Sequence, residues 1–117
     1  MENLKAIAIF PEIPPQNLDE FKRIAQELLQ RVAEQDSVIN YEMFFTLDNS
    51  KCVVIEEYKT PDGVIEHVNK NKALLEQLTS LGGKIEGSMF PRTLRGQAIE
   101  QIQNTWDSKM HIYFGGK

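Results

Sequence analysis

The residues of this chain that could do chemistry gather in a short stretch that begins in an apolar run and ends in a helix. They are Glu56, Glu57, Tyr58, His67 and Asn71. Because residues four apart share one face of a helix, His67 and Asn71 would point the same way, along an otherwise apolar stripe. A histidine that titrates near neutrality could take a proton from a phenol or hydroquinone. The plainer alternative is a half-exposed histidine and an asparagine that caps a break in the helix.

Glu56 and Tyr58 stand two positions apart at the end of the run KCVVIEEY. Side chains alternate along a strand, so both would lie on one face and Glu57 on the other. We expect Tyr58 to line a pocket and Glu56 to accept a hydrogen bond there, from a ligand or from the backbone. A strand end that emerges into water stays open as the alternative, and Glu57 is expected to be solvated or structural.

Aromatic residues of neighbouring strands could form the walls of such a pocket. The sequence offers Tyr41, Phe44, Phe45 and Phe90. Core packing is the ordinary role of an aromatic strand residue, and contact with an aromatic ligand is the alternative. We expect substrate contacts from Tyr41, Phe45 and Phe90, together with Glu56.

Length and composition restrict the classes of protein that the chain could belong to. Its 117 residues, 41% hydrophobic and 26% charged, fit a single globular domain that spans 1–117. The one cysteine, Cys52, rules out an intrachain disulfide and a zinc site built on cysteines, and its expected role is packing. A net charge of −4 without a basic cluster argues against nucleic acid as a partner. The sequence has neither a signal-peptide pattern nor the ~20 apolar residues of a membrane span, so we expect a cytoplasmic protein.

Alternating and β-branched runs predict the strands. They are expected at residues 5–10, 38–48, 51–58, 84–90 and 111–114. The turn residues Asp48-Asn49-Ser50 would join the second and third strands into a hairpin.

Hydrophobic periodicity predicts three helices between and after these strands. The first is expected at 18–32, with Asn17 and Glu20 as a capping box. The second is expected at 61–82, capped by Thr60 and stopped by a pair of glycines, and its Asn-Lys-Asn-Lys run is expected to bend or break it. The third is a shorter helix at 95–106.

The resulting order, β-α-β-β-α-β followed by a helix and a strand, is that of a ferredoxin-like α+β fold. Helices would cover one face of a four-stranded antiparallel sheet. The strands at 38–48 and 51–58 carry apolar residues on both faces, so the uncovered face should bury against a partner. A homodimer that closes two sheets into an α/β barrel is the simplest assembly.

Three stretches carry a resemblance to a known family: Tyr41-Glu42, the strand end VIEEY at 54–58 and the helix start VIEHV at 64–68. The shared pattern is an apolar strand that ends Glu-x-aromatic, a short turn, and a helix with a histidine about nine residues beyond the aromatic. In this pattern, and in the order of elements over essentially the whole chain, the sequence resembles the antibiotic biosynthesis monooxygenase (ABM) family. These dimeric α+β barrels include quinol-monooxygenase-like proteins.

The resemblance implies a cofactor-independent monooxygenase that acts on a phenolic, quinol or polycyclic aromatic molecule. In such enzymes the deprotonated substrate itself donates an electron to O₂, so neither metal nor flavin is expected. By resemblance, His67 would accept the proton, with Tyr58 and Asn71 as hydrogen-bonding partners. The expected partners of the chain are an aromatic small molecule and a second copy of itself.

Two other classes of function stay open. Many ABM members carry a second histidine about five residues after the first, where this chain has Asn71-Lys72, and its loss favours a non-catalytic module that binds or senses a hydrophobic small molecule. RNA-recognition motifs share the order of elements, but their third strand carries a basic residue, glycines and exposed aromatics. Here that strand reads CVVIEEY, which argues against RNA. The tryptophan expected of haem-degrading relatives is absent from its usual place, so haem degradation is not expected.

Overall fold

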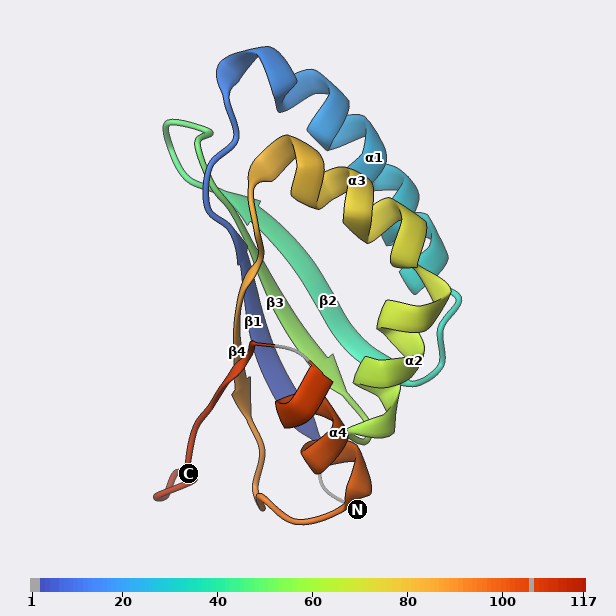
Figure 1. Cartoon of the computed structure of the whole chain (residues 1–117), viewed down its shortest axis with the longest axis vertical. Helices are drawn as coiled ribbons and strands as arrows, with labels where there is room; N and C mark the ends of the chain where they lie inside the picture. Colours follow the sequence, from blue (N-terminus) through green and yellow to red (C-terminus); the bar gives the residue numbers. More distant parts are fainter. Residues whose placement is uncertain (1–2, 106) are drawn as a thin grey trace.

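A computed structural model describes residues 3–105 and 107–117 of the chain (Figure 1). The strands are β1 (Leu4–Phe10), β2 (Val38–Phe45), β3 (Cys52–Tyr58), β4 (Glu86–Phe90) and β5 (Lys109–Met110). The helices are α1 (Leu18–Val32), α2 (Asp62–Lys70), α3 (Lys72–Gly82) and α4 (Gln97–Thr105), with a 3-10 turn (Pro15–Asn17) before α1. Within these residues, none of the helices combines the length and the apolar content that crossing a membrane requires.

The five strands form one sheet in the order β2-β3-β1-β4-β5. The first four pair antiparallel, and β5 adds to the edge of β4 in parallel. All four helices lie on the same face of this sheet, with α1 and α3 side by side and α2 continuing from α3 toward α4 (Figure 1). The predicted α+β class and ferredoxin-like arrangement are therefore confirmed, and β5 makes the sheet a mixed one.

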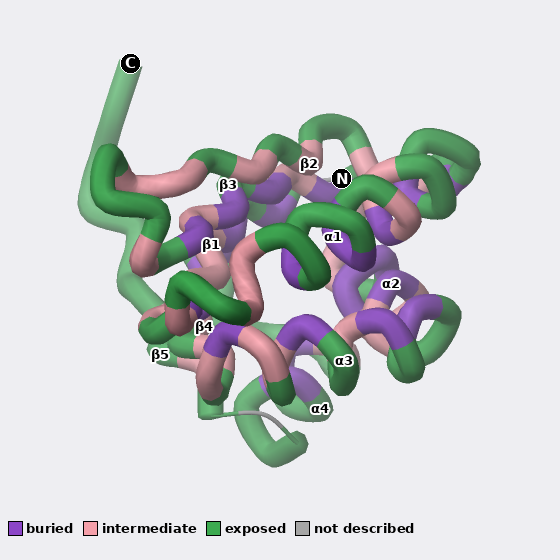
Figure 2. The backbone as a smooth tube through the Cα atoms, turned by 90° about the horizontal axis from the view of Figure 1, so that it is seen from above, coloured by how far each residue is buried: buried purple, intermediate pink, exposed green. Residues whose placement is uncertain are grey.

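Two groups of buried residues form the core between the sheet and the helices. Figure 2 shows buried residues along the backbone of both layers. The larger group lies under α1 and α3, and its bulkiest members include Phe10, Phe21, Leu28 and Leu78. The rings of Phe10 and Phe21 meet edge to face, with 5.1 Å between their centroids. Gly82 permits this close approach, because a Cβ there would lie 2.7 Å from the Phe21 ring. The smaller group lies toward α2 and α4, where the candidate chemistry is found.

The predicted break in the second helix falls at Asn71 and is confirmed. Asn71 adopts φ −115° and ψ 19°, which ends α2 and starts α3. Its backbone N–H still donates to the carbonyl oxygen of His67, and its own carbonyl accepts from the N–H of Leu75. The chain therefore changes direction here while both flanking helical turns keep their hydrogen bonds.

The start of α1 at Leu18 and the N-cap position of Asn17 are confirmed, but the predicted capping box does not form. The side-chain amide of Asn17 instead donates to the carbonyl oxygen of Leu81 at 3.2 Å. The helical backbone angles of Asn17 explain this, because a capping residue normally adopts extended angles. At α2 the predicted cap is wrong, because Pro61 rather than Thr60 takes the N-cap position.

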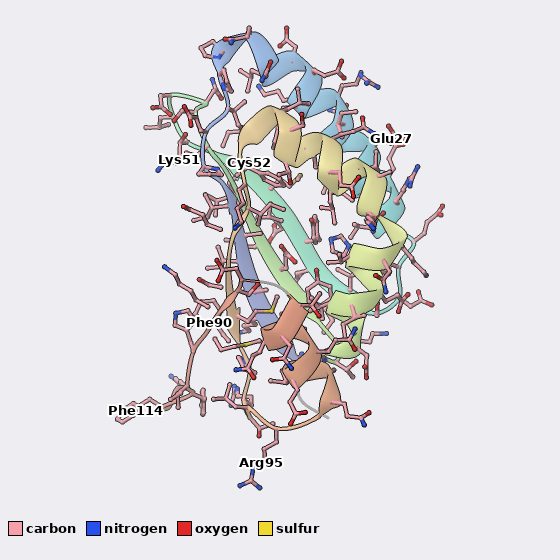
Figure 3. All side chains as sticks on the ribbon, viewed as in Figure 1. Glu27, Lys51, Cys52, Phe90, Arg95 and Phe114 are labelled. Carbon is pink, nitrogen blue, oxygen red and sulfur yellow. The ribbon has the colours of Figure 1, made fainter. Side chains whose placement is uncertain are left out.

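The predicted last strand at 111–114 is also wrong. The parallel pairing with β4 uses Lys109 and Met110, and it closes with the N–H of His111 on the carbonyl oxygen of Met89 at 3.0 Å. Beyond that point the chain runs away from β4 and exposes Phe114 at its outer end (Figure 3). The β-forming residues there predicted a strand, but the chain leaves the sheet edge before they could pair. The last residue of the third predicted helix, Trp106, lies outside the described residues.

The face of the sheet opposite the helices is apolar at its centre. In register across three strands, it carries Ile7, Ile9, Phe44, Val53 and Ile55. Phe44 is 49% exposed and Ile55 is 45% exposed. Phe90 lies on this face too, on the far side of the sheet from the helices (Figure 3). An apolar patch of this kind commonly marks an interaction surface.

Candidate active site

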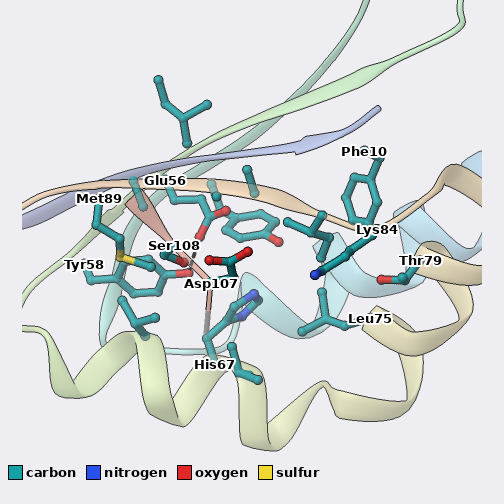
Figure 4. A pocket seen from close by; sticks show the side chains of 18 residues that line it. Phe10, Glu56, Tyr58, His67, Leu75, Thr79, Lys84, Met89, Asp107 and Ser108 are labelled. Atoms are coloured by element: carbon teal, nitrogen blue, oxygen red, sulfur yellow. Dashed lines mark hydrogen bonds between the residues drawn. The ribbon is translucent and has the colours of Figure 1, made fainter. Parts of the chain in front are cut away.

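A cavity of about 310 Å³ lies between the helix-facing side of the sheet and the α2–α3 pair (Figure 4). Small residues of the strands leave the space open: Ala6 and Ala8 on β1, and Gly87 on β4. A Cβ at Gly87 would come within 2.9 Å of the Ser108 hydroxyl oxygen, so glycine also lets the segment before β5 approach the sheet. The cavity is therefore a consequence of small side chains where strands usually carry large ones.

Glu56 and Tyr58 reach into this cavity from β3 (Figure 4). Buried positions alternate along the strand with partly or fully exposed ones, so both side chains fall on the helix-facing side, where Tyr58 is 0% and Glu56 only 8% exposed. The Tyr58 hydroxyl donates a hydrogen bond of 2.5 Å to Oε1 of Glu56. The two residues therefore form a buried acid–phenol pair, and neither is a solvated strand end.

Burial governs the proton affinity of this pair. Removal from water raises the pKa of Glu56 to about 7, while the hydrogen bond from Tyr58 opposes part of that rise. Burial also raises the pKa of Tyr58, and the nearby Glu56 carboxylate raises it further. Tyr41 behaves in the same way, with burial as the larger cause and Glu56 as the second. Near neutral pH both tyrosines keep their protons, and Glu56 is the member of the group that titrates.

His67 enters the cavity from α2 and is fixed by Asn71, one turn later (Figure 4). The side-chain nitrogen of Asn71 lies 3.1 Å from Nδ1 of His67 and 2.9 Å from its carbonyl oxygen. Both residues are buried, at 3% and 2% exposure. Burial lowers the pKa of His67 to about 4, so the ring is neutral at physiological pH.

The structure brings four of the predicted site residues together. Tyr41 lies directly opposite Glu56 in the β2–β3 pairing, and its ring centroid is 4.9 Å from that of His67. The ring of Tyr58 lies 6.0 Å from His67 on another side. Two phenols, a carboxyl and a neutral imidazole thus surround the same space, within a lining that is otherwise mainly apolar. Asn71 does not line the cavity, so it can act there only through His67.

Phe45 and Phe90, two predicted substrate contacts, are not brought to this cavity. Phe45 faces the helices as expected but lies farther along β2, where its ring packs edge to face on Phe21 at 6.0 Å between centroids. Phe90 points to the opposite side of the sheet, because its neighbour Met89 takes the inward position. Its ring stacks on His111 at 4.5 Å between centroids, so the predicted substrate contact is not made in this cavity.

Several lining residues carry no signal in the sequence. Lys84, Asp107 and Ser108 approach the cavity from the β4 side, and Thr79 from α3. They lie in loops or in the middle of a helix, without a spacing that would relate them to His67. The pairing of β4 with β1 and of β5 with β4 brings Lys84, Asp107 and Ser108 there. Across residues 3–105 and 107–117, His, Cys, Asp and Glu side chains form no group of three that could hold a metal ion.

No protein-family model matches the chain, and neither does any curated protein sequence. Solved structures do. MupZ from Pseudomonas fluorescens matches with a TM-score of 0.84 over 100% of this chain and 94% of its own, at 12% identity. A conserved protein from Methanosarcina mazei Go1 matches with a TM-score of 0.71 over 80% of this chain and 95% of its own, at 18% identity. An antibiotic biosynthesis monooxygenase matches with a TM-score of 0.64 over 74% of this chain and 92% of its own, at 20% identity.

These likenesses concern the fold. The chain has the ABM-like ferredoxin fold that its sequence pattern resembled, and the class of its structural neighbours includes proteins described as ABM monooxygenases. Because the match to MupZ covers the whole chain, it extends over α4 and the C-terminal segment as well. At 12–20% identity the neighbours carry no assignment of substrate or activity to this chain.

Proposed function

We propose that the chain is a cofactor-independent monooxygenase that acts on a phenolic, quinol or polycyclic aromatic small molecule. One observation carries the proposal: a largely apolar cavity holds the buried Tyr58–Glu56 pair opposite a neutral His67. A volume of about 310 Å³ is within the range of small-molecule sites, and a few convergent polar groups in an apolar lining are typical of them. The ABM-like fold supports the same class of reaction.

The reaction would convert the substrate and O₂ into a quinone and water. Loss of the phenolic proton gives a phenolate, which passes one electron to O₂. The resulting phenoxyl radical and superoxide couple, forming a C–O bond at a ring carbon that carries a hydrogen. The peroxide then takes up one proton, and loss of water breaks its O–O bond and that C–H bond to leave a carbonyl. The protein would desolvate the substrate, stabilise its anion and handle the protons.

Oxygen uptake tests this function directly. The purified protein is placed in an oxygen electrode with a panel of hydroquinones and anthrones, alongside His67→Ala. His111→Ala is the matched control, because His111 is the only other histidine and lies outside the cavity lining. Uptake that falls in the first variant and persists in the control supports the proposal. Absence of uptake with every compound contradicts it.

The second candidate function is a non-catalytic module that binds or senses an aromatic small molecule in the same cavity. Two observations favour it: Asn71 stands near the place where many ABM members carry a second histidine, and burial makes His67 a weak base by lowering its pKa to about 4. Stabilisation of the protein by a hydroquinone or anthrone, without oxygen consumption, would support the non-catalytic binding function.

We also propose that two copies of the chain associate through the apolar face of the sheet. Ile7, Phe44, Val53 and Ile55 form a continuous apolar surface there, on the side that the helices leave open. Burial of this surface against itself would remove the patch from water.

A further inference from the structure

We propose that Glu56 receives the phenolic proton of the substrate by way of the Tyr58 hydroxyl, while His67 donates a hydrogen bond to the substrate oxygen. This assignment rests on the proposed monooxygenase function and specifies its proton transfer. It differs from the expectation by resemblance, in which His67 is the base.

The Asn71 amide determines which nitrogen of His67 carries the ring proton. Its Nδ2 lies within hydrogen-bond distance of both the carbonyl oxygen and Nδ1 of His67. An amide turned the other way would set its oxygen against that carbonyl oxygen, an acceptor against an acceptor. The NH₂ group must therefore face His67, which makes Nδ1 an acceptor and leaves the proton on Nε2. A ring in this state can give a hydrogen bond from Nε2 but has no free nitrogen with which to take a proton.

Glu56 has the complementary properties. It lines the cavity, and its Oε1 already accepts the Tyr58 proton at 2.5 Å. Burial raises the pKa of its carboxyl to about 7, the range in which a base can take a proton from a phenol and later return it. In the transfer, the substrate O–H bond breaks as the Tyr58 oxygen takes that proton, and the original Tyr58 proton moves to Oε1 of Glu56. Two O–H bonds break and two form, and no group is oxidised or reduced.

The groups that face Glu56 leave it as the titrating group of the cluster. Tyr58 follows it on β3, Tyr41 lies opposite on β2, and His67 approaches from α2. On the other side, β1 presents Ala6, which carries no charge. The raised pKa values of both tyrosines and the lowered pKa of His67 keep all three neutral near pH 7.

Besides Glu56, the described lining of the cavity has two charged side chains, Lys84 and Asp107. Both belong to exposed residues, so solvent screens their charges. Glu76 supplies the matched control: it is an exposed glutamate of α3 that lies outside the cavity lining, so Glu76→Gln makes the same change as Glu56→Gln away from the site.

Two measurements on the same variants test the assignment. The variants are Glu56→Gln, which keeps an oxygen for the Tyr58 hydroxyl, Tyr58→Phe, and the control Glu76→Gln. The first measurement is kcat/KM for oxygen uptake with a hydroquinone as a function of pH. The second is the absorbance of bound 4-nitrophenol, whose phenolate is coloured, because it reports proton loss without turnover.

In the wild type we expect kcat/KM to rise about tenfold per pH unit and to level off near the Glu56 pKa of about 7. Glu56→Gln should lower it at least ~100-fold and remove this inflection, and Tyr58→Phe should lower it by a similar factor. Glu76→Gln should change neither property. Bound 4-nitrophenol should form its phenolate on the wild type and on Glu76→Gln, but not on Glu56→Gln.

An inflection that persists in Glu56→Gln overturns the assignment and leaves the monooxygenase function standing. Phenolate formation that requires Glu56, without oxygen uptake by the wild type, supports the assignment and overturns the function. A wild type that shows neither uptake nor phenolate formation overturns both. His67→Gln retains a side-chain N–H donor and should keep the pH profile, whereas loss of the inflection there would assign the base to His67.

Discussion

The side-chain nitrogen of Asn71 hydrogen-bonds two atoms of His67, the imidazole Nδ1 at 3.1 Å and the backbone carbonyl oxygen at 2.9 Å. This places the break between α2 and α3 in direct contact with the candidate site. The residue that ends α2, Asn71, also orients through its side chain the imidazole ring that enters the cavity. A change at Asn71 should therefore alter the state of the imidazole before it alters the fold.

The tautomer of His67 is the first prediction. Long-range ¹H–¹⁵N spectra of the wild type should show one neutral tautomer, protonated on Nε2, from pH 5.5 to pH 8, because the pKa of His67 lies at about 4. In Asn71→Ala the ring should exchange between both tautomers. Loss of the buried partner should also lower the free energy of unfolding by about 1–3 kcal/mol. The chain has only two histidines, so the signals can be assigned by comparison with His111→Ala. A wild-type ring protonated on Nδ1 would contradict the prediction.

The pH dependence of stability provides a second prediction. The pKa of Glu56 rises from its ordinary 4.5 to about 7, so between these values the folded protein holds a proton that the unfolded chain has released. The free energy of unfolding should therefore fall as pH rises through this window, by roughly 3 kcal/mol from this group alone. Glutamine at this position cannot titrate. In urea titrations, the free energy of unfolding of Glu56→Gln should rise by about that much relative to the wild type between pH 4.5 and pH 8.

His67 should make the free energy of unfolding depend on pH in the opposite direction. Its pKa falls from 6.5 to about 4, so below pH 6.5 the unfolded chain binds a proton that the folded protein excludes. In Glu56→Gln, where the glutamate no longer compensates, the free energy of unfolding should drop on acidification from pH 6.5 to pH 4. For the Glu56 prediction, a stability difference between Glu56→Gln and the wild type that does not change with pH would show that Glu56 has an ordinary pKa.

Cys52 should be unreactive in the folded protein. It is fully buried between the sheet and the helices, and burial raises the pKa of its thiol to about 11. Since the thiolate is the reactive form, iodoacetamide should label it only when the chain unfolds. Leu47→Cys is the matched control, because residue 47 lies in the exposed turn between β2 and β3 and should be labelled at once. Rapid labelling of Cys52 in the native protein would contradict its burial.

Local patterns predicted most of the fold. The stripe from Leu18 to Val32 identified α1, the glycines at 82 and 83 marked the end of α3, and the polar run around Asn71 located the helix break. The two-residue strand β5 could not be predicted in this way. Two residues are too few to show an alternating pattern, and the parallel pairing of β5 with β4 is a long-range contact that local patterns do not predict. The apolar residues at 111–114 suggested a strand from composition alone.

The sequence predicted on which face of a strand or helix a site residue lies. It did not predict how far along the element that residue is from the cavity. Period two correctly placed Glu56 and Tyr58 on one face, and helical spacing correctly related His67 to Asn71. Parity also turned Phe45 inward, but it could not show that four positions along β2 separate this ring from the cavity region near Tyr41. Residues 84 and 107 reach the cavity only through strand pairing, for which a single sequence has no signal.

Association of two copies is the last prediction. Ile55 lies at the centre of the apolar sheet face, opposite Ile7 on β1 and Glu42 on β2, and is 45% exposed in the single chain. A glutamate there would place a charge in the middle of the proposed interface, beside an existing carboxylate, at little cost to the isolated fold. Light scattering should therefore give twice 13.4 kDa for the wild type and 13.4 kDa for Ile55→Glu, with unchanged circular dichroism. Leu47→Glu adds the same charge to the exposed β2–β3 turn and should remain dimeric, since that residue lies outside the apolar centre of the face. A wild type that is monomeric at micromolar concentration, or a dimer that survives Ile55→Glu, would rule out this face as the interface.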